Sequence, residues 1–314
     1  MHVPRVSYVV TVYNKAPYLP FVVAGLAAQS GDFAREFIFV DDGSSDDSRA
    51  VLERLTAGWP ERRLIAQANR GPALALNAGL AAARGEFIKT LDGDDMLTPE
   101  ATATLLGAVA SGRAGFAFGT AGTYVPADGL DAAQRQAQAC RGAGGIELVP
   151  EALRASLRRA QTTTSSWLAR ADLVHAVGGA DEGVFVQDYS IELRLAEATA
   201  FARVPLVVYL APSAAPGRQS EQGAQELHDL NLAVARFVER RPRLPRSLQR
   251  HALRRTAGRA WHYAHRQAGQ GYASRAFWRH ALAQLGLVRA DAAAIRVTCD
   301  IFRRADAIKL VAAP

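Results

Sequence analysis

The chain contains few cysteines, few lysines and no long hydrophobic run, and these shortages exclude several classes of protein. Among its 314 residues there are two cysteines, Cys140 and Cys299, and neither stands at a metal-binding spacing. This excludes a disulfide framework and a cysteine-based zinc site, and it fits a reducing compartment. The most apolar later stretch, residues 204–216, is too short to span a bilayer and is broken by prolines. No signal-peptide pattern is visible at the start, so we expect a soluble, cytoplasmic protein.

Arginine, by contrast, is abundant and unevenly distributed. The net charge is +7, but residues 1–220 sum to −3 and residues 221–314 to +10. Segment 236–280 alone holds twelve arginines against one acid, Glu239. Apolar side chains recur there at helical spacing, which predicts packed helices. The asymmetry predicts two modules, a first domain over residues 1–220 and a basic helical region over residues 221–314.

Three interpretations of the basic region stay open. Its arginines can lie on the outer face of packed helices. A basic amphipathic surface can instead make peripheral contact with an anionic membrane at its inner face, with Trp261, Phe277 and Trp278 among the headgroups. Contact with nucleic acid is the third interpretation, but no recognised nucleic-acid module accompanies the charge, so no such partner is expected.

The first half of the chain alternates between strand and helix patterns. Apolar, β-branched runs at residues 6–12, 36–40, 63–66 and 86–91 are separated by helical stretches. Such alternation predicts βαβ units and an α/β fold with a mostly parallel sheet. Ligands of these sheets bind beyond the carboxyl ends of the strands. We therefore expect the chemistry just after residues 12, 40 and 91.

Clustered carboxylates follow two of these strands. Residues 92–95 read Asp-Gly-Asp-Asp, and hard oxygen ligands at that spacing suit Mg²⁺ or Mn²⁺. A solvated turn bent at the glycine is the alternative. Asp41 and Asp42 follow the second strand, where an acid can accept hydrogen bonds from a nucleobase or ribose. They can equally help to cap a helix that begins after Ser45.

The order of the motifs along the chain is more informative than each motif by itself. The sequence runs through Tyr13-Asn14, Asp41-Asp42-Gly43-Ser44, Asn69-Arg70-Gly71, Asn77-Ala78-Gly79, Gly85-Glu86-Phe87-Ile88 and Leu91-Asp92-Gly93-Asp94-Asp95. Further along come Gly178-Gly179-Ala180-Asp181-Glu182 and Gln187-Asp188. Over about residues 5–215, this resembles the family 2 glycosyltransferases of the GT-A fold.

The resemblance implies specific roles. Asp42 or Asp41 would hold the base and ribose of a nucleotide, Asp94 would bind the metal, and Asp188 would be the catalytic base. Without the resemblance, Asp188 would be interpreted as the N-cap of a helix. Arg218, in the loop after the last strand, either closes over a diphosphate or is exposed to solvent. The expected substrate-binding residues are Thr11, Tyr13, Asn14, Asp41, Asp42, Asn77, Asp92 and Arg218.

Three positions depart from the family pattern. Thr11 stands where a proline is common, and Leu76 occupies the place of a frequent arginine before Asn77. Gln187 replaces the usual glutamate beside Asp188, which removes a negative charge next to the expected base.

The expected function is that of an inverting glycosyltransferase. It would move a sugar from a nucleotide-sugar donor to a hydroxyl of a glycan or lipid-linked acceptor, as in cell envelope polysaccharide biosynthesis. Inversion and the metal-assisted mechanism are implied by the resemblance. A non-catalytic nucleotide-sugar-binding module is one alternative. A sugar-1-phosphate nucleotidyltransferase is another, but it needs a glycine-rich basic loop after the first strand, where this chain has Tyr13-Asn14-Lys15.

Overall fold

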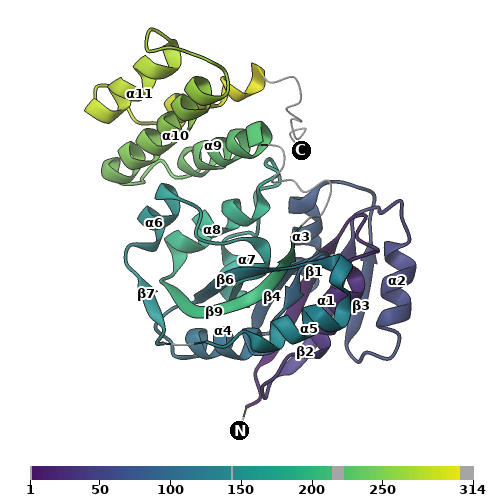
Figure 1. Ribbon diagram of the computed structural model, residues 1–314. Coiled ribbons are helices and arrows are strands. Elements are labelled where there is room, and N and C mark those ends of the chain that lie inside the picture. The colour runs from purple at the N-terminus through teal and green to yellow at the C-terminus, as the bar shows by residue number, and fades with distance from the viewer. Residues whose placement is uncertain (1, 143, 214–222, 305–314) are drawn as a thin grey trace. The chain divides into compact units, whose positions relative to one another are not determined.

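The computed structural model describes residues 2–142, 144–213 and 223–304, and these form two compact units. The first unit contains residues 1–152, 162–180 and 198–216, and the second contains residues 153–161, 181–197 and 217–314. Each unit is assembled from three separate segments of the chain. Their elements are labelled in Figure 1.

The first unit is built on one mixed sheet. Its strands lie in the order β3-β2-β1-β4-β8-β6-β9-β5, and β7 pairs with β9. The first four strands in this order are parallel, which confirms the predicted βαβ pattern. The strands are β1 (Arg5–Val12), β2 (Ala34–Asp41), β3 (Arg62–Ala66), β4 (Phe87–Asp92), β5 (Met96–Leu97), β6 (Phe116–Tyr124), β7 (Glu147–Val149), β8 (Trp167–Arg170) and β9 (Phe201–Pro212).

Helices cover both faces of this sheet. Tyr8 and Val10 of β1 belong to the apolar core that α1, α2 and α4 share. Val9, which points to the opposite face, lies against Gly79 of α3, where an added Cβ would meet the Val9 side chain at 2.3 Å. The helices of this unit are α1 (Leu19–Ala27), α2 (Ser48–Leu55), α3 (Pro72–Ala82), α4 (Ala101–Ala110), α5 (Leu130–Ala139) and α7 (Ala171–Ala176).

The register of the central strands aligns their carboxyl ends. Val12 of β1 pairs with Asp41 of β2, and Thr11 of β1 pairs with Asp92 of β4. Because parallel strands end at the same edge, the residues that follow all three strands meet there. This edge positions the candidate site.

The second unit is helical. Its apolar core joins Tyr189 and Leu193 of α8 to Val234 and Phe237 of α9 and Leu253 of α10. The amphipathic helices predicted for the basic region are therefore present and packed. They are α6 (Ala152–Arg158), α8 (Gln187–Ala198), α9 (Gly223–Glu239), α10 (Arg246–Arg266), α11 (Arg275–Leu285) and α12 (Ala292–Arg296).

This grouping differs from the sequence-based division at residue 220. Residues 153–161 and 181–197, which were assigned to the first domain, cluster with the C-terminal helices. The reason lies in the apolar face of α8, which packs on α9 and α10 within one core. In the part of the chain that the structure describes, no helix is long and apolar enough to cross a membrane.

Candidate functional site

The polar residues at the sheet edge form a connected group. The Thr11 hydroxyl lies 3.5 Å from Asp92 Oδ1, and the backbone N–H of Asp92 donates to Ser165 Oγ at 2.9 Å. Gly93 is packed closely, since a Cβ there would lie 2.8 Å from the carbonyl oxygen of Thr11. A side chain at residue 93 would therefore collide with β1. The glycine allows Asp92 and Asp94 to flank the end of that strand.

Asp94 forms an ion pair with Lys15. The Lys15 ammonium lies 2.6 Å from Asp94 Oδ2, and the exposed fractions of the two side chains are 24% and 8%. Tyr124 Oη also donates to the backbone carbonyl of Asp94 at 3.0 Å. Sequence reasoning did not single out Lys15, although it directly follows the Tyr13-Asn14 motif. Its place directly after that motif was the only signal in the sequence that could have identified Lys15.

A second lysine lies beneath the cluster. Lys89 of β4 is fully buried, and its ammonium donates to the carbonyl oxygens of Thr90 and Ser165 at 2.6 and 2.7 Å. Burial lowers the pKa of Lys89 to about 7, against the opposing attraction of the Asp95 and Asp92 carboxylates. Lys89 thus places positive charge under carboxylates that would otherwise repel one another.

The chemistry of the donor set fits a hard divalent cation. Asp94 offers carboxylate oxygens, and Asp92 and Asp95 lie beside it in the chain. Residues 2–142, 144–213 and 223–304 contain no group of three or more metal-binding side chains. Mg²⁺ commonly takes one or two protein carboxylates and fills its remaining positions with water and substrate phosphates. Asp94 fits that mode, with Lys15 as a competing cation.

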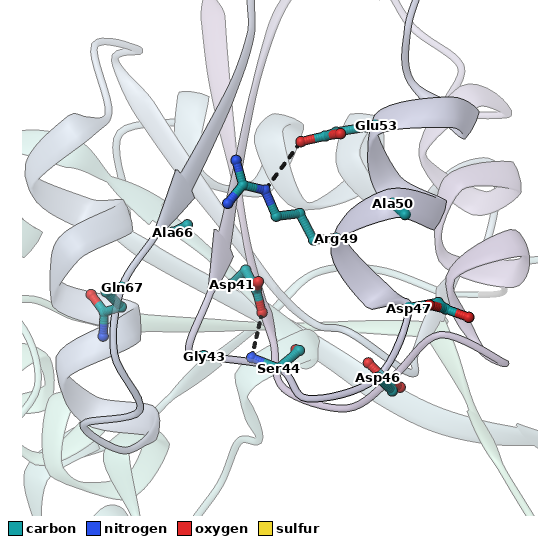
Figure 2. A pocket seen from close by; sticks show the side chains of 10 residues that line it. All are labelled: Asp41, Gly43, Ser44, Asp46, Asp47, Arg49, Ala50, Glu53, Ala66 and Gln67. Carbon is teal, nitrogen blue, oxygen red and sulfur yellow. Dashed lines mark hydrogen bonds and ion pairs between the residues drawn. The ribbon is translucent and has the colours of Figure 1, made fainter.

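Asp41 lines a cavity of about 470 Å³ at the ends of β2 and β3, beside α2. Figure 2 shows the Asp41 carboxylate accepting from the backbone N–H of Ser44, at 3.0 Å. Arg49 and Glu53 of α2 form an ion pair on the other side of the cavity. The cavity lining therefore contains hydrogen-bond donors and acceptors, and side chains of both charges. Its lining residues are Asp41, Gly43, Ser44, Asp46, Asp47, Arg49, Ala50, Glu53, Ala66 and Gln67.

Asp42 has different surroundings. Its carboxylate accepts from Gln67 Nε2 at 2.7 Å and from the backbone N–H groups of Arg70 and Gly71 at 3.0 and 2.9 Å. The carboxylate therefore holds the turn that leads into α3. Asp42 is absent from the cavity lining, so Asp41 is the one of these two adjacent acids that lines the cavity.

Asn14 organises the turn after β2. Its Oδ1 accepts from the backbone N–H of Ser45 at 2.8 Å, and its own N–H donates to Ser44 Oγ at 3.0 Å. The expected start of the next helix, just after Ser45, was wrong, because α2 begins at Ser48 with Asp47 at the N-cap position. Residues 43–47 form a loop held by Asn14. The neighbouring Tyr13 side chain is 47% exposed.

Asn77 joins α3 to the Gly178-Gly179 turn. Its carboxamide accepts from the backbone N–H of Ala180 at 2.9 Å and donates to the carbonyl of Ala180 at 3.1 Å. Gly179 has a φ of +64°, and a Cβ there would lie 2.4 Å from Asn77 Oδ1. Asn77 thus positions the turn at Gly178-Gly179. This contact accounts for both the Asn77-Ala78-Gly79 motif and the Gly178-Gly179 motif. Its predicted contact with substrate stays a prediction.

Asp188 lies in the second unit, in the first turn of α8. Asp188 is half-buried, and its Oδ1 accepts from the backbone N–H of Tyr189 at 2.7 Å. Burial raises the pKa of Asp188 to about 6, and the nearby Glu192 and Glu226 carboxylates add to the rise. A carboxylate with this pKa is a stronger base than an exposed aspartate and is still mostly ionised at neutral pH.

Asp181, an alternative candidate base in the same unit, is held by arginines. Arg236 and Arg240 approach its carboxylate to 2.8 Å and Arg194 to 3.5 Å. Although burial acts to raise the pKa of Asp181, hydrogen bonding and attraction to Arg236 dominate and lower it. Asp181 is thus a poor proton acceptor, which favours Asp188. Arg218, the predicted diphosphate contact, lies outside the described residues.

Comparison of the sequence with known proteins identifies related glycosyltransferases. The family model described as Glycosyl transferase family 2 matches residues 7–165. The succinoglycan biosynthesis protein ExoO of Rhizobium meliloti (strain 1021) is 41% identical over 99 residues, which cover 31% of this chain and 28% of that protein. The first matching curated relatives are covered over only 28% to 30% of their own length.

Solved structures match nearly the whole chain. S. aureus TarS in complex with UDP-GlcNAc has a TM-score of 0.58 at 15% identity, over 96% of this chain and 92% of that chain. Mannosyltransferase PcManGT from Pyrobaculum calidifontis, in complex with GDP-Man and Mn²⁺, has a TM-score of 0.57 at 18% identity, over 96% and 86%. These likenesses confirm the predicted GT-A-type fold. The match of the family model to half of this chain shows that the chain belongs to glycosyl transferase family 2.

Proposed function

We propose that the protein is an inverting glycosyltransferase that uses a nucleotide-sugar donor. The observation that carries this proposal is the half-buried Asp188 carboxyl in the first turn of α8, whose raised pKa suits a general base. Asp188 would take the proton of an acceptor hydroxyl as that oxygen attacks the anomeric carbon. The bond from the anomeric carbon to the diphosphate then breaks on the opposite side, so the configuration inverts.

The first unit would hold the donor. Asp41 faces a cavity of about 470 Å³, where it can accept hydrogen bonds from a base or ribose. Asp94 would hold Mg²⁺ or Mn²⁺. A bound divalent cation would stabilise the negative charge that develops on the departing nucleoside diphosphate. PcManGT, a structural neighbour described with GDP-Man and Mn²⁺, supports this assignment.

The acceptor is proposed from the relatives. ExoO is described as a succinoglycan biosynthesis protein, and another relative is an undecaprenyl-phosphate 4-deoxy-4-formamido-L-arabinose transferase. A glycan or lipid-linked acceptor of the cell envelope is consistent with both.

Peripheral contact with an anionic membrane would accompany such an acceptor. Trp278, Leu282 and Leu285 follow one another at i, i+4 and i+7 on α11, and all three are exposed. Trp261 does not fit the predicted membrane surface, since it is buried and stacks with His265. The surface that supports the membrane interpretation is therefore the outer face of α11.

The deciding experiment is Asp188→Asn. An asparagine keeps the size and can still accept from the Tyr189 N–H, but it cannot take a proton. We expect donor binding to be unchanged and turnover to fall about 10²–10⁴-fold. Turnover would be measured with a labelled nucleotide sugar and an extracted acceptor, and donor binding by calorimetry. Asp291→Asn, at the N-cap of α12 in the same unit, is the matched control.

Turnover of Asp188→Asn within a few-fold of the parent would defeat the assignment of the base. A parent that binds nucleotide sugar but transfers nothing to any envelope acceptor would instead favour the non-catalytic binding module.

A further inference from the structure

A basic cavity of about 620 Å³ lies wholly within the second unit, among the end of α6 and helices α9, α10 and α11. Among the residues that the structure describes, no carboxylate lines it. The arginines in its lining are Arg158, Arg254, Arg255, Arg259 and Arg266. Three histidines, His251, His262 and His280, complete its basic groups.

These arginines differ from others in the same unit. Arg236 and Arg240 pair with Asp181, and Arg241 pairs with Glu197. Within the described ranges, by contrast, none of the five cavity arginines lies within ion-pair distance of a carboxylate. Glu226 attracts Arg259 only at longer range. The charges of Arg236, Arg240 and Arg241 are therefore balanced by carboxylates, whereas those of the five cavity arginines are not, as far as the described part of the chain extends.

Several of the cavity arginines are held in place through single hydrogen bonds. Arg259 Nη1 donates to Asn231 Oδ1 at 2.6 Å, and Arg255 Nε donates to the carbonyl of Arg158 at 2.9 Å. Arg254 Nε donates to the carbonyl of Ala283 at 3.3 Å. A guanidinium has five N–H donors, so each retains donors for a ligand. Ordering these side chains in advance reduces the entropy that binding costs.

His251 adds an unsatisfied group to the cavity lining. Its Nε2 is buried and has no hydrogen-bond partner among the described residues. Burial lowers the pKa of His251, and the positive charges of Arg154, Arg255, Arg158 and Arg254 lower it further. A bound anion would offset this crowding of positive charge and could accept from the imidazole.

We propose that this cavity binds the phosphate groups of a compact ligand with at least two negative charges, such as a diphosphate. Planar guanidinium groups bind phosphate oxygens in pairs, and several of them around one hollow suit a small polyanion. The ligand can be a soluble diphosphate or the phosphate headgroup of a lipid. Because the cavity lining contains none of Asp41, Asp94 and Asp188, the proposal does not depend on the proposed glycosyl transfer.

The test uses inorganic pyrophosphate and the full chain in metal-free buffer, with binding measured by calorimetry. Arg255→Gln with Arg266→Gln removes two charges from the cavity. Arg250→Gln with Arg279→Gln removes two charges from exposed positions of α10 and α11 outside it. We expect the first pair to weaken binding at least tenfold and the second to change it less than threefold. Circular dichroism would verify that both variants are folded.

Equal weakening by both pairs would mean that pyrophosphate responds to overall charge, which overturns the proposal. The proposal also fails if the parent does not bind pyrophosphate, or if the cavity pair binds it like the parent. Vesicles that contain phosphatidic acid then separate the two sources. If these vesicles displace pyrophosphate from the parent but neutral vesicles do not, the ligand is a headgroup. If neither displaces it, the ligand is soluble, and the proposal holds in both cases.

Discussion

The two adjacent aspartates at the end of β2 differ in what their carboxylates contact. Asp41 faces the cavity, and Asp42 holds the turn before α3 through Gln67, Arg70 and Gly71. From the sequence, Asp42 was put first for nucleotide binding. A motif does not reveal which of two adjacent carboxylates accepts hydrogen bonds from the protein's own backbone and which one faces a ligand. We therefore expect the two acids to respond differently to substitution.

Asp41→Ala should weaken nucleoside diphosphate binding in metal-free buffer, because the carboxylate that faces the cavity is lost. Asp42→Ala should lower the free energy of unfolding by about 1–3 kcal/mol, because two backbone N–H groups lose their acceptor. Calorimetry and urea unfolding would measure the two effects. If Asp42→Ala weakens binding more than Asp41→Ala while the protein stays fully folded, Asp42 is the nucleotide contact.

A prediction for the metal concerns Asp94 and Lys15, which lie 2.6 Å apart. Asp94→Asn should abolish metal-dependent binding of the nucleoside diphosphate and leave the fold intact. Lys15→Gln should act in the opposite direction and raise the affinity for Mn²⁺ severalfold, because the competing ammonium is gone. Titration with Mn²⁺ followed by nucleotide checks both. Unchanged metal-dependent binding by Asp94→Asn would remove the assignment.

The pKa of Asp188 predicts a pH dependence. A general base must be ionised, so turnover should fall tenfold per unit as the pH drops below about 6. Protonation favours the folded state, because the folded pKa lies above the usual value of about 3.9. That stabilisation is complete below about pH 4 and is lost as the pH rises through about 6. Asp188→Asn should therefore gain thermal stability relative to the parent as the pH rises from about 4 to above 6, by scanning calorimetry.

At the scale of elements, strands β1 to β4 and the helices between them were predictable from their apolar periodicity, whereas the short strands β5, β7 and β8 were not predicted. The predicted strand at residues 6–12 is β1 (Arg5–Val12), and the predicted strand at residues 63–66 is β3 (Arg62–Ala66). The start of α2 was not predictable, because Asn14, thirty-one positions earlier, binds Ser45 and delays the helix. The Lys15–Asp94 pair, the buried Lys89 and the cavity at Asp41 all depend on strand register, which one sequence does not give.

Whether Asn77 fixes the turn between α7 and Asp181 can be tested by adding one methyl group to that turn. Gly179→Ala would place a Cβ 2.4 Å from Asn77 Oδ1 at a φ of +64°. Gly112→Ala, at a φ of +73° with no atom within 4 Å, carries the same backbone strain without the collision. We expect Gly112→Ala to cost about 1–2 kcal/mol of stability and Gly179→Ala clearly more. Equal losses in urea unfolding would mean that Asn77 yields easily and does not fix the turn.

For the whole molecule, the charge asymmetry and the outer face of α11 predict membrane binding. The protein should sediment with vesicles that contain anionic lipid and not with neutral ones, and less so as salt rises. Trp278→Ser with Leu285→Ser should reduce sedimentation, because apolar insertion is lost. Val125→Ser with Ile146→Ser, at exposed positions of the first unit, is a control for general loss of apolar surface. Equal sedimentation with both lipids, or none, removes the membrane interpretation.

The three-segment construction of the second unit bears on synthesis at the ribosome. Helix α8, which carries Asp188, is translated before α9 and α10, so Tyr189 and Leu193 are made before their core partners. The parallel strands of the first unit are complete in sequence by Asp92 and can pair much earlier. Folding during translation should therefore assemble the donor-side sheet first. The surroundings of the proposed base would form only after α9 and α10 have been translated.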